Sequence, residues 1–303
     1  MSSWELWRIP AWRAFGGSPN PKRDTVRTSL LGVPLDSTSS FYPGSRFAPS
    51  AVRAVSESLE WYSYVMERAL PENMVYDEGD LLVKPDDVSF SLRVTSEALR
   101  ELVEEGRFPV LLGGEHTVTY AATEILDGDS LLVVFDAHLD ARDEYLGSRL
   151  NHATVMRRIL DKLPSECILF VGTRALSEEE EEFARSAGLK FISSRRVWAY
   201  GPRRAALSLR EAVRGKERVY ISIDVDVLDP AYAPGVGTPE PLGLDPHSLL
   251  ALLGPLLSSA NVVGADVVEV NPLLDRSSAT SFMAAKLIIE LAAAAQLRRE
   301  LSR

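Results

Sequence analysis

The sequence predicts a three-layer α/β/α sandwich whose mostly parallel, doubly wound sheet lies between two layers of helices. Short apolar runs alternate with helical patterns, and several runs are apolar at every position, as in strands covered on both faces. The expected strands are 29–33, 74–77, 109–112, 131–135, 167–171, 190–192, 218–223 and 262–268. The expected helices are 49–66, 89–105, 118–125, 153–163, 178–187, 202–214, 246–258 and 277–302. This alternation is typical of parallel α/β proteins.

The 303 residues are expected to form one domain, because no Ser/Gly-rich linker or shift of composition divides them. Residues 1–27 differ in character, since they hold three Trp residues among many Gly, Pro and Arg. We expect an arm there, whose aromatic side chains pack either on a neighbouring subunit or on the protein's own body.

Charge and cysteine content narrow the classes of partner. A net charge of −10 disfavours nucleic acid and membrane surfaces and mildly favours small cationic ligands. The single Cys167 lies in an apolar run, which predicts a buried thiol, no disulfide and a reducing, cytoplasmic location. The most apolar stretch, 282–297, contains Lys286 and Glu290, which favours a core helix over a membrane span.

Six potential metal ligands fall in three short clusters, each where an expected strand meets a loop. They are His116, then Asp136, His138 and Asp140, then Asp224 and Asp226. The carboxyl ends of parallel strands share one edge of a sheet, so the clusters are expected to meet. The members of the second cluster are two residues apart and share one side if the strand geometry continues. Taken singly, the first cluster would also suit a turn, and the last a cap or a pair of surface residues.

Two imidazoles and four carboxylates are more ligands than one ordinary ion needs. They suit two divalent ions that prefer oxygen, Mn²⁺ better than Zn²⁺. Three ionisable groups directly after an apolar strand also need a cation to offset their burial. Because a two-metal site generates hydroxide near neutral pH, the sequence predicts a hydrolase.

Five blocks of the sequence resemble those of one enzyme family. They include Gly-Gly-Glu-His within 113–119, Asp-Ala-His-Leu-Asp at 136–140 and Ser-Ile-Asp-Val-Asp within 222–241, together with 43–49 and 266–272. These resemble the signature blocks of the ureohydrolase (arginase/agmatinase) family over residues 28–298, with Ala48 in place of the usual glycine. The resemblance implies the α/β/α fold, two bridged Mn²⁺ ions per subunit, and hydrolysis of a guanidino group to urea and an amine.

Three further roles follow from this resemblance. Glu269 would pair with the guanidinium group, Asp140 would give a proton to the leaving amine, and His152 would shuttle protons and position substrate. From the residues alone, Glu269 could instead end a surface strand, and His152 could begin a surface helix.

The loop 141–150 resembles the agmatinase loop and lacks the Ser-Gly-Asn pattern with which arginases hold an α-carboxylate. If they line the mouth of the site, Asp143 and Glu144 would attract a distal amine; otherwise they form a solvated pair. The expected reaction is agmatine to putrescine and urea, in polyamine biosynthesis. The alternatives are N1-aminopropylagmatine, a spermidine precursor, and guanidino acids, arginine or free guanidine. The resemblance also implies a homotrimer or homohexamer.

The sequence also bears on three other classes of protein. Two-metal phosphoesterases share the Asp-x-His block but need a later Gly-Asn-His, which the chain lacks. Single-zinc deacetylases would leave His116 and one aspartate idle. A non-catalytic metal-binding scaffold would need a broken site, whereas every family ligand position is filled. Two Mn²⁺ per subunit would exclude deacetylase-like chemistry, and urea release would exclude the scaffold.

Overall fold

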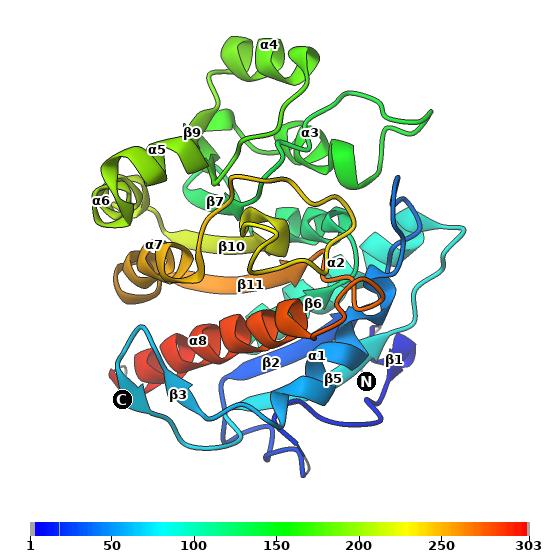
Figure 1. Ribbon diagram of the computed structural model, residues 1–303. Helices are drawn as coiled ribbons and strands as arrows, with labels where there is room; N and C mark the ends of the chain where they lie inside the picture. Colours follow the sequence, from blue (N-terminus) through cyan, green and yellow to red (C-terminus); the bar gives the residue numbers. More distant parts are fainter. Residues whose placement is uncertain (1–3, 18, 302–303) are drawn as a thin grey trace.

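A nine-stranded sheet in the order β1-β5-β2-β6-β11-β10-β7-β8-β9 forms the centre of the protein (Figure 1). The computed structural model describes residues 4–17 and 19–301. Every neighbouring pair runs parallel except β1 and β5. The strands are β1 (Arg8–Ile9), β2 (Thr28–Val33), β5 (Val75–Leu81), β6 (Phe108–Gly113), β7 (Ser130–Phe135), β8 (Ile168–Val171), β9 (Lys190–Ile192), β10 (Arg218–Asp224) and β11 (Val262–Val268).

Two layers of helices cover the sheet, which confirms the predicted α/β/α class. One layer comprises α1 (Ala48–Ser56), α5 (Ser194–Tyr200), α6 (Pro202–Val213), α7 (Pro246–Ser259) and α8 (Ala279–Leu301). The other comprises α2 (Val88–Glu104), η3 (His116–Glu124), α3 (Val155–Leu160) and α4 (Glu178–Ala187). Short 3-10 segments are η1 (Trp4–Trp7), η2 (Ser45–Phe47), η4 (His152–Thr154), η5 (Ser165–Cys167) and η6 (Val225–Val227).

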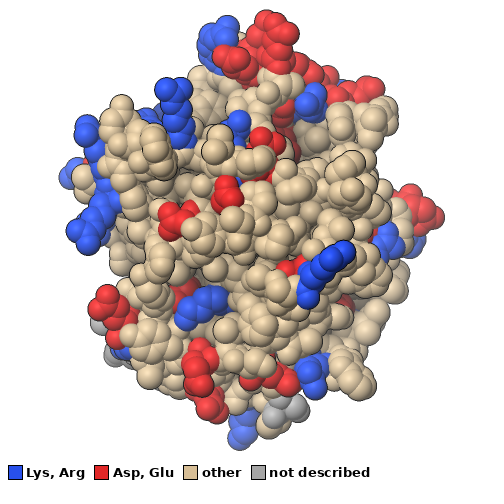
Figure 2. Space-filling model, in the orientation of Figure 1, with Lys and Arg blue, Asp and Glu red and all other residues tan. Residues whose placement is uncertain are grey.

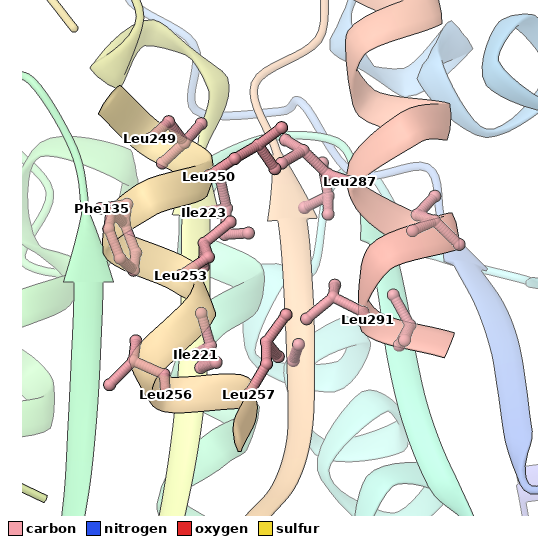
Figure 3. Close-up of a cluster of buried hydrophobic side chains, with 14 of the residues drawn as sticks. Phe135, Ile221, Ile223, Leu249, Leu250, Leu253, Leu256, Leu257, Leu287 and Leu291 are labelled. Atoms are coloured by element: carbon pink, nitrogen blue, oxygen red, sulfur yellow. The ribbon is translucent and has the colours of Figure 1, made fainter. Parts of the chain in front are cut away.

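The central strands are apolar on both faces because each face meets a helical layer. In β7, Val133 and Phe135 lie in one core cluster, whereas Leu132 and Val134 lie in the other. Figure 3 shows the first cluster, where leucines of α7 and α8 pack against β10 and β7. The continuous apolar runs of the sequence are therefore explained by burial on two sides.

Helix α8 is a core helix, as the sequence predicts. Its segment Ala279–Leu297 is long and apolar enough for a membrane span, but 72% of the most apolar part is buried inside the protein. Glu290 within it accepts hydrogen bonds from the Ser63 hydroxyl at 2.6 Å and the Tyr64 amide at 2.6 Å. The buried charge thus anchors a neighbouring segment of the chain.

That segment is where the sequence-based prediction of a helix at 49–66 is wrong. Helix α1 ends at Ser56, and a two-stranded hairpin of β3 (Tyr62–Ser63) and β4 (Arg68–Ala69) follows. Ser63 and Tyr64 are held by Glu290, which lies more than two hundred positions away in the sequence. Helical periodicity could not reveal these contacts. Helix α5 is a further element that the sequence analysis did not predict.

The arm at 1–27 packs at several points on the protein's own body; its residues 1–3 and 18 lie outside the described residues. Trp4 is 1% exposed, and Trp7 meets Phe90 edge-on with ring centres 5.0 Å apart. Strand β1 pairs with β5, where Gly79 leaves room for the backbone of the arm. Trp12 is 96% exposed, so an interface role of the arm remains a prediction.

Candidate metal centre and active site

Four neighbouring strands, β6, β11, β10 and β7, carry the candidate residues at their carboxyl ends (Figure 1). His116 begins η3 directly after the β6 turn, and Asp224 ends β10. The segment 136–140 follows β7, and Glu269 follows β11. Parallel register places these ends side by side, so the three sequence clusters meet at one edge of the sheet.

The first group of potential ligands is His116, Asp136 and Asp140. Nδ1 of His116 lies 3.0 Å from Oδ2 of Asp136 and 3.0 Å from Oδ2 of Asp140. Oδ2 of Asp224 lies 3.5 Å from the same nitrogen. One ligand atom of each group member lies within 4.8 Å of the others, so a single cation can contact all three.

The second group is His138, Asp136 and Asp226. Nδ1 of His138 lies 2.9 Å from Oδ2 of Asp226 and 3.7 Å from Oδ1 of Asp136. The expected strand geometry does not continue through this segment, because Asp140 has a φ of 53°. Asp136 belongs to both groups and turns one oxygen to each histidine. Its carboxylate is therefore placed to bridge two cations.

A buried chain of hydrogen bonds orients the His116 ring. Nε2 of His116 lies 3.1 Å from the Ser222 hydroxyl, which donates to Oδ1 of Asp266 at 2.7 Å. Because that hydroxyl hydrogen points to Asp266, the hydroxyl oxygen accepts from Nε2–H. Nδ1 then faces the carboxylates with its lone pair free for a cation bound among them. The sequence analysis did not assign a role to Ser222 or Asp266.

The cluster holds more negative charge than the protein neutralises. Burial acts to raise the pKa of Asp136, but the neighbouring imidazoles of His116 and His138 outweigh it and hold that pKa below its usual range. Burial and the Asp136 charge raise the pKa of Asp140 to about 7. Burial and neighbouring aspartates raise the pKa of Asp224 well above its usual value. Among the described residues, no Lys or Arg forms an ion pair with these carboxylates.

The donor set fits a pair of divalent metal ions. Oδ2 of Asp136 is buried and accepts no hydrogen bond, although a buried carboxylate oxygen normally has a partner. Imidazole nitrogens and carboxylate oxygens are ligands that Mn²⁺ accepts. A bound cation would give Oδ2 of Asp136 a partner and would offset the negative charge of the buried carboxylates.

Glu269 lies beside the first group in a strained backbone conformation. Its φ is 65°, and its amide donates to the Gly114 carbonyl at 2.8 Å. Its Oε1 accepts a hydrogen bond from the His116 amide at 2.7 Å. Burial and the nearby Glu115 carboxylate raise the pKa of Glu269 to about 8. Only glycine fits at position 114, because a side chain there would meet the Leu35 carbonyl at 1.9 Å.

A cleft of roughly 380 Å³ opens beside the cluster and is lined by His138, Asp140 and His152, among others. Nε2 of His152 lies 3.1 Å from the Ser40 hydroxyl, and its Nδ1 is buried without a partner. Burial and the positive charges of the neighbouring histidines lower the pKa of His152 to about 4. The neutral ring can therefore accept a proton or hydrogen bond within the cleft.

Asp143 and Glu144 do not line this cleft. The Asp143 carboxylate instead accepts hydrogen bonds from Arg158 at 2.7 Å and Arg149 at 2.9 Å. Glu144 is exposed on the same loop. Arg142 and Tyr145 are the side chains of this loop that line the cleft instead.

Two supporting residues escaped the sequence analysis because their contacts are distant in sequence. Thr38 donates from its amide and its hydroxyl to Glu115, each at 2.8 Å, and its hydroxyl oxygen accepts from the His152 amide at 3.0 Å. Arg174 donates to backbone carbonyls that include Asp226 and Glu240, each at 2.7 Å. These bonds tie the loop that carries Asp226 to the end of β8.

Comparison with known proteins places this arrangement among metal-dependent hydrolases. The model of the arginase family matches residues 26–294. Agmatinase of Bacillus anthracis is 35% identical over 276 residues, which cover 90% of this chain and 93% of that protein. The mitochondrial guanidino acid hydrolase of Homo sapiens is 36% identical over 87% of this chain and 76% of its own length. The crystal structure of agmatine ureohydrolase of Thermoplasma volcanium aligns with a TM-score of 0.82 and 36% identity, covering 91% of this chain and 92% of the other.

Proposed function

The chain belongs to the arginase family, enzymes that hydrolyse guanidino groups, and we propose that it converts agmatine and water to putrescine and urea at two manganese ions. The observation that carries the proposal is the pair of ligand groups joined by Asp136 beside a cleft. The complete ligand set argues against a non-catalytic scaffold. The membership argues against phosphoesterase and deacetylase chemistry.

In this proposal, His116, Asp136 and Asp140 hold one ion, and Asp136, His138 and Asp226 hold the other. Asp224, 3.5 Å from Nδ1 of His116, completes the set. When bound, such an ion pair lowers the pKa of a water molecule so that hydroxide is available near neutral pH. That the ions are manganese, and that each subunit binds two, is part of what we propose.

The side chains around the ions hold the substrate and move protons. Glu269, anchored by the His116 amide, pairs with the guanidinium as a planar fork facing a carboxylate. Water adds to the guanidino carbon, and the bond from that carbon to the substituted nitrogen breaks. Asp140 takes a proton from the adding water and passes it to the departing nitrogen, and the amine takes up the remaining proton, so that guanidinium and water become urea and an ammonium ion. His152, which lines the cleft, orients the substrate and exchanges protons.

Agmatine is the first candidate substrate because several of the similar proteins are named agmatinases. A guanidino acid is the second candidate, since Arg142 lines the cleft and would suit a carboxylate at the far end of the substrate. N1-aminopropylagmatine shares the reacting group and is the third candidate. A place in polyamine synthesis and a cytoplasmic location are part of the same proposal.

A urea-release panel with Mn²⁺-loaded protein tests the proposal. Agmatine should exceed arginine in kcat/KM by at least about 100-fold, or about 2.7 kcal/mol. The loop 141–150 lacks the Ser-Gly-Asn pattern with which arginases hold the α-carboxylate of arginine. Comparison with 4-guanidinobutyrate separates the two candidates. If that acid is preferred, and Arg142→Ala removes the preference while sparing agmatine, the guanidino acid assignment replaces agmatine. Equal rates for arginine and agmatine would contradict both.

A further inference from the structure

Two arginines, Arg142 and Arg174, lie among the side chains that line the cleft beside the metal centre. Other Lys and Arg side chains gather over α5 and α6 at the left edge of Figure 2, and Asp and Glu gather over α4 at its top. A cation beside a metal centre needs a physical reason, because its charge repels the metal ion. The hydrogen bonds of Arg174 supply that reason.

The guanidinium of Arg174 bonds to backbone carbonyls and forms no ion pair with a carboxylate of the described residues. Its Nε, Nη1 and Nη2 all donate. The bonds are between 2.7 and 3.3 Å long and reach the carbonyls of Gly172, Asp226, Val227, Leu228, Glu240 and Pro241. Because all three nitrogens are used in this way, the side chain joins neighbouring backbone segments and has no nitrogen left for a substrate carboxylate.

The backbone of Arg174 holds a second segment that carries metal ligands. Its amide donates to the Ala137 carbonyl at 2.8 Å. Ala137 lies between the ligands Asp136 and His138, and its own amide donates to Oδ1 of Asp226 at 3.0 Å. The Asp226 carboxylate is therefore tied to the Ala137 amide, and the Asp226 carbonyl is tied to the Arg174 side chain at 2.7 Å. Three segments hold one another in place, and two of them carry ligands.

These contacts favour the second ligand group over the first. His138 and Asp226 belong to the second group alone, and Nδ1 of His138 lies 2.9 Å from Oδ2 of Asp226. His116 and Asp140 complete the first group, and within the described part of the chain neither forms a hydrogen bond with Arg174. Other hydrogen bonds hold these two residues. The two groups therefore depend on different parts of the structure.

We propose that Arg174 is a positioning residue for the second metal ion: it fixes His138 and Asp226 relative to each other and so raises the affinity of that ligand group. The inference rests on the two-ion site of the proposed function. Two effects of Arg174 oppose each other. Its charge repels the ion, but water in the cleft screens that charge. Its hydrogen bonds hold the ligands directly, and residues that orient metal ligands are worth roughly 10- to 100-fold in metal affinity. The positioning effect should therefore dominate.

Binding of Mn²⁺ to the full chain, first stripped of metal with a chelator, tests the inference. Electron paramagnetic resonance of the free ion counts the bound ions at each Mn²⁺ concentration. The wild type should bind two ions per subunit. Arg174→Met should weaken one ion by roughly 10- to 100-fold and leave the other within about twofold. Unchanged binding would overturn the inference. So would tighter binding, because it would show that charge repulsion dominates.

Two single-site backgrounds assign the weakened ion to a ligand group. His138→Ala leaves the first group intact, and His116→Ala leaves the second group intact. Adding Arg174→Met should hardly affect the ion that His138→Ala retains. It should weaken the ion that His116→Ala retains by the same factor as in the wild type. The reverse pattern, or equal weakening in both backgrounds, would contradict a role confined to the second group.

Two other arginines provide matched controls. Arg142 lines the same cleft, but its guanidinium lies over the Tyr145 ring, 5.2 Å from its centre, and 3.8 Å from Glu180. Arg142→Met therefore removes a positive charge from the cleft without loosening His138 or Asp226. Arg107 also donates to carbonyls, but it lies at the amino end of β6, and Arg107→Met controls for a general loss of stability. Both controls should bind two ions as the wild type does; weakening of one ion by either control as much as by Arg174→Met would contradict the inference.

Arg174→Lys keeps the test decisive if Arg174→Met does not fold. Lysine retains the positive charge, but its single nitrogen cannot reach carbonyls of several segments at once. Arg174→Lys should therefore weaken the second ion about 10-fold. Wild-type affinity for both ions in this variant would contradict the inference alone, since the two-ion site would remain. A wild type that binds fewer than two ions would instead contradict the proposed function, and this inference with it.

Discussion

Asp77 and Glu78 of β5 are as deeply buried as the aspartates of the metal centre, yet arginines of the same chain neutralise them. Arg53 holds Asp77 through two hydrogen bonds of 2.7 Å and 2.9 Å. Arg8 and Arg23 each contact Glu78 at 2.8 Å. The acids of β5 thus form a closed ion-pair network that fastens the arm to the sheet.

The acids at the ends of β7 and β10 have no arginine or lysine partner among the described residues. Among the described residues, the cationic groups in direct contact with these carboxylates are His116 and His138 when protonated, and one oxygen of Asp136 has no hydrogen bond. Both clusters must offset the cost of burial. Arginines of the chain offset the charge of the β5 acids. The charge of the acids at the ends of β7 and β10 needs a bound cation. Burial of acids alone does not mark a metal site; burial without an internal cation does.

The largest expected effect is on the cluster that depends on an external cation. Chelation should abolish urea release, and Mn²⁺ should restore it much better than Mg²⁺. Asp226→Ala or His138→Ala should lose at least one of two ions per subunit and about 1,000-fold or more in kcat/KM. Metal analysis of the purified variants, alongside urea release, is the measurement. A variant with one ion and full activity would contradict the two-metal proposal.

Arg53→Leu tests the ion-pair network of Asp77 and Glu78, in which arginines of the chain neutralise the buried acids. Asp77 would be left buried without its cation, and the free energy of unfolding should fall by about 3–5 kcal/mol. Metal content should not change. Thermal or denaturant unfolding measures the loss. Arg100→Leu is the control, because Arg100 forms an exposed pair with Glu104 and its loss should shift the midpoint very little. Equal shifts for the two variants would remove the distinction between buried and exposed pairs.

Glu269 is a third case, a buried acid whose cation would be the substrate. Glu269→Gln keeps the shape and the hydrogen bond from the His116 amide but removes the charge. It should cost about 2–5 kcal/mol of transition-state binding, or roughly 30- to 4,000-fold in kcat/KM for agmatine. The two metal ions should remain. Loss of an ion in this variant would make Glu269 a ligand instead of a substrate partner.

The smallest effect is expected at Asp143 and Glu144. Arg149 and Arg158 already neutralise Asp143, as arginines neutralise the acids of β5, so it has no charge to spare for a substrate amine. Asp143→Asn with Glu144→Gln should change kcat/KM for agmatine at most about twofold. A larger loss confined to agmatine, with 4-guanidinobutyrate unaffected, would show that the acids reach the substrate after all.

Local patterning was enough to predict the central strands, the layers of helices and the three ligand clusters. Apolar runs at 109–112, 131–135 and 218–223 lie within β6, β7 and β10, because buried parallel strands need apolar side chains on both faces. Asp and His residues directly after such runs stand out because the runs themselves contain almost no polar side chains. The predicted helix 49–66 was wrong past Ser56 because contacts with Glu290, far along the chain, fix a hairpin there.

The sequence by itself therefore determined the fold class, the candidate ligands and the expectation of a guanidino hydrolase. Tertiary structure decided how those residues pair. It assigned Asp136 to both ligand groups, turned Nδ1 of His116 toward the carboxylates through Ser222, and directed Asp143 to arginines and away from the cleft. Spacing along a strand reports which residues share an edge or a face. Which charged groups meet depends on side chains that the fold brings from distant segments. The burial of these groups, and not their spacing along the chain, sets the free energy of each ion pair.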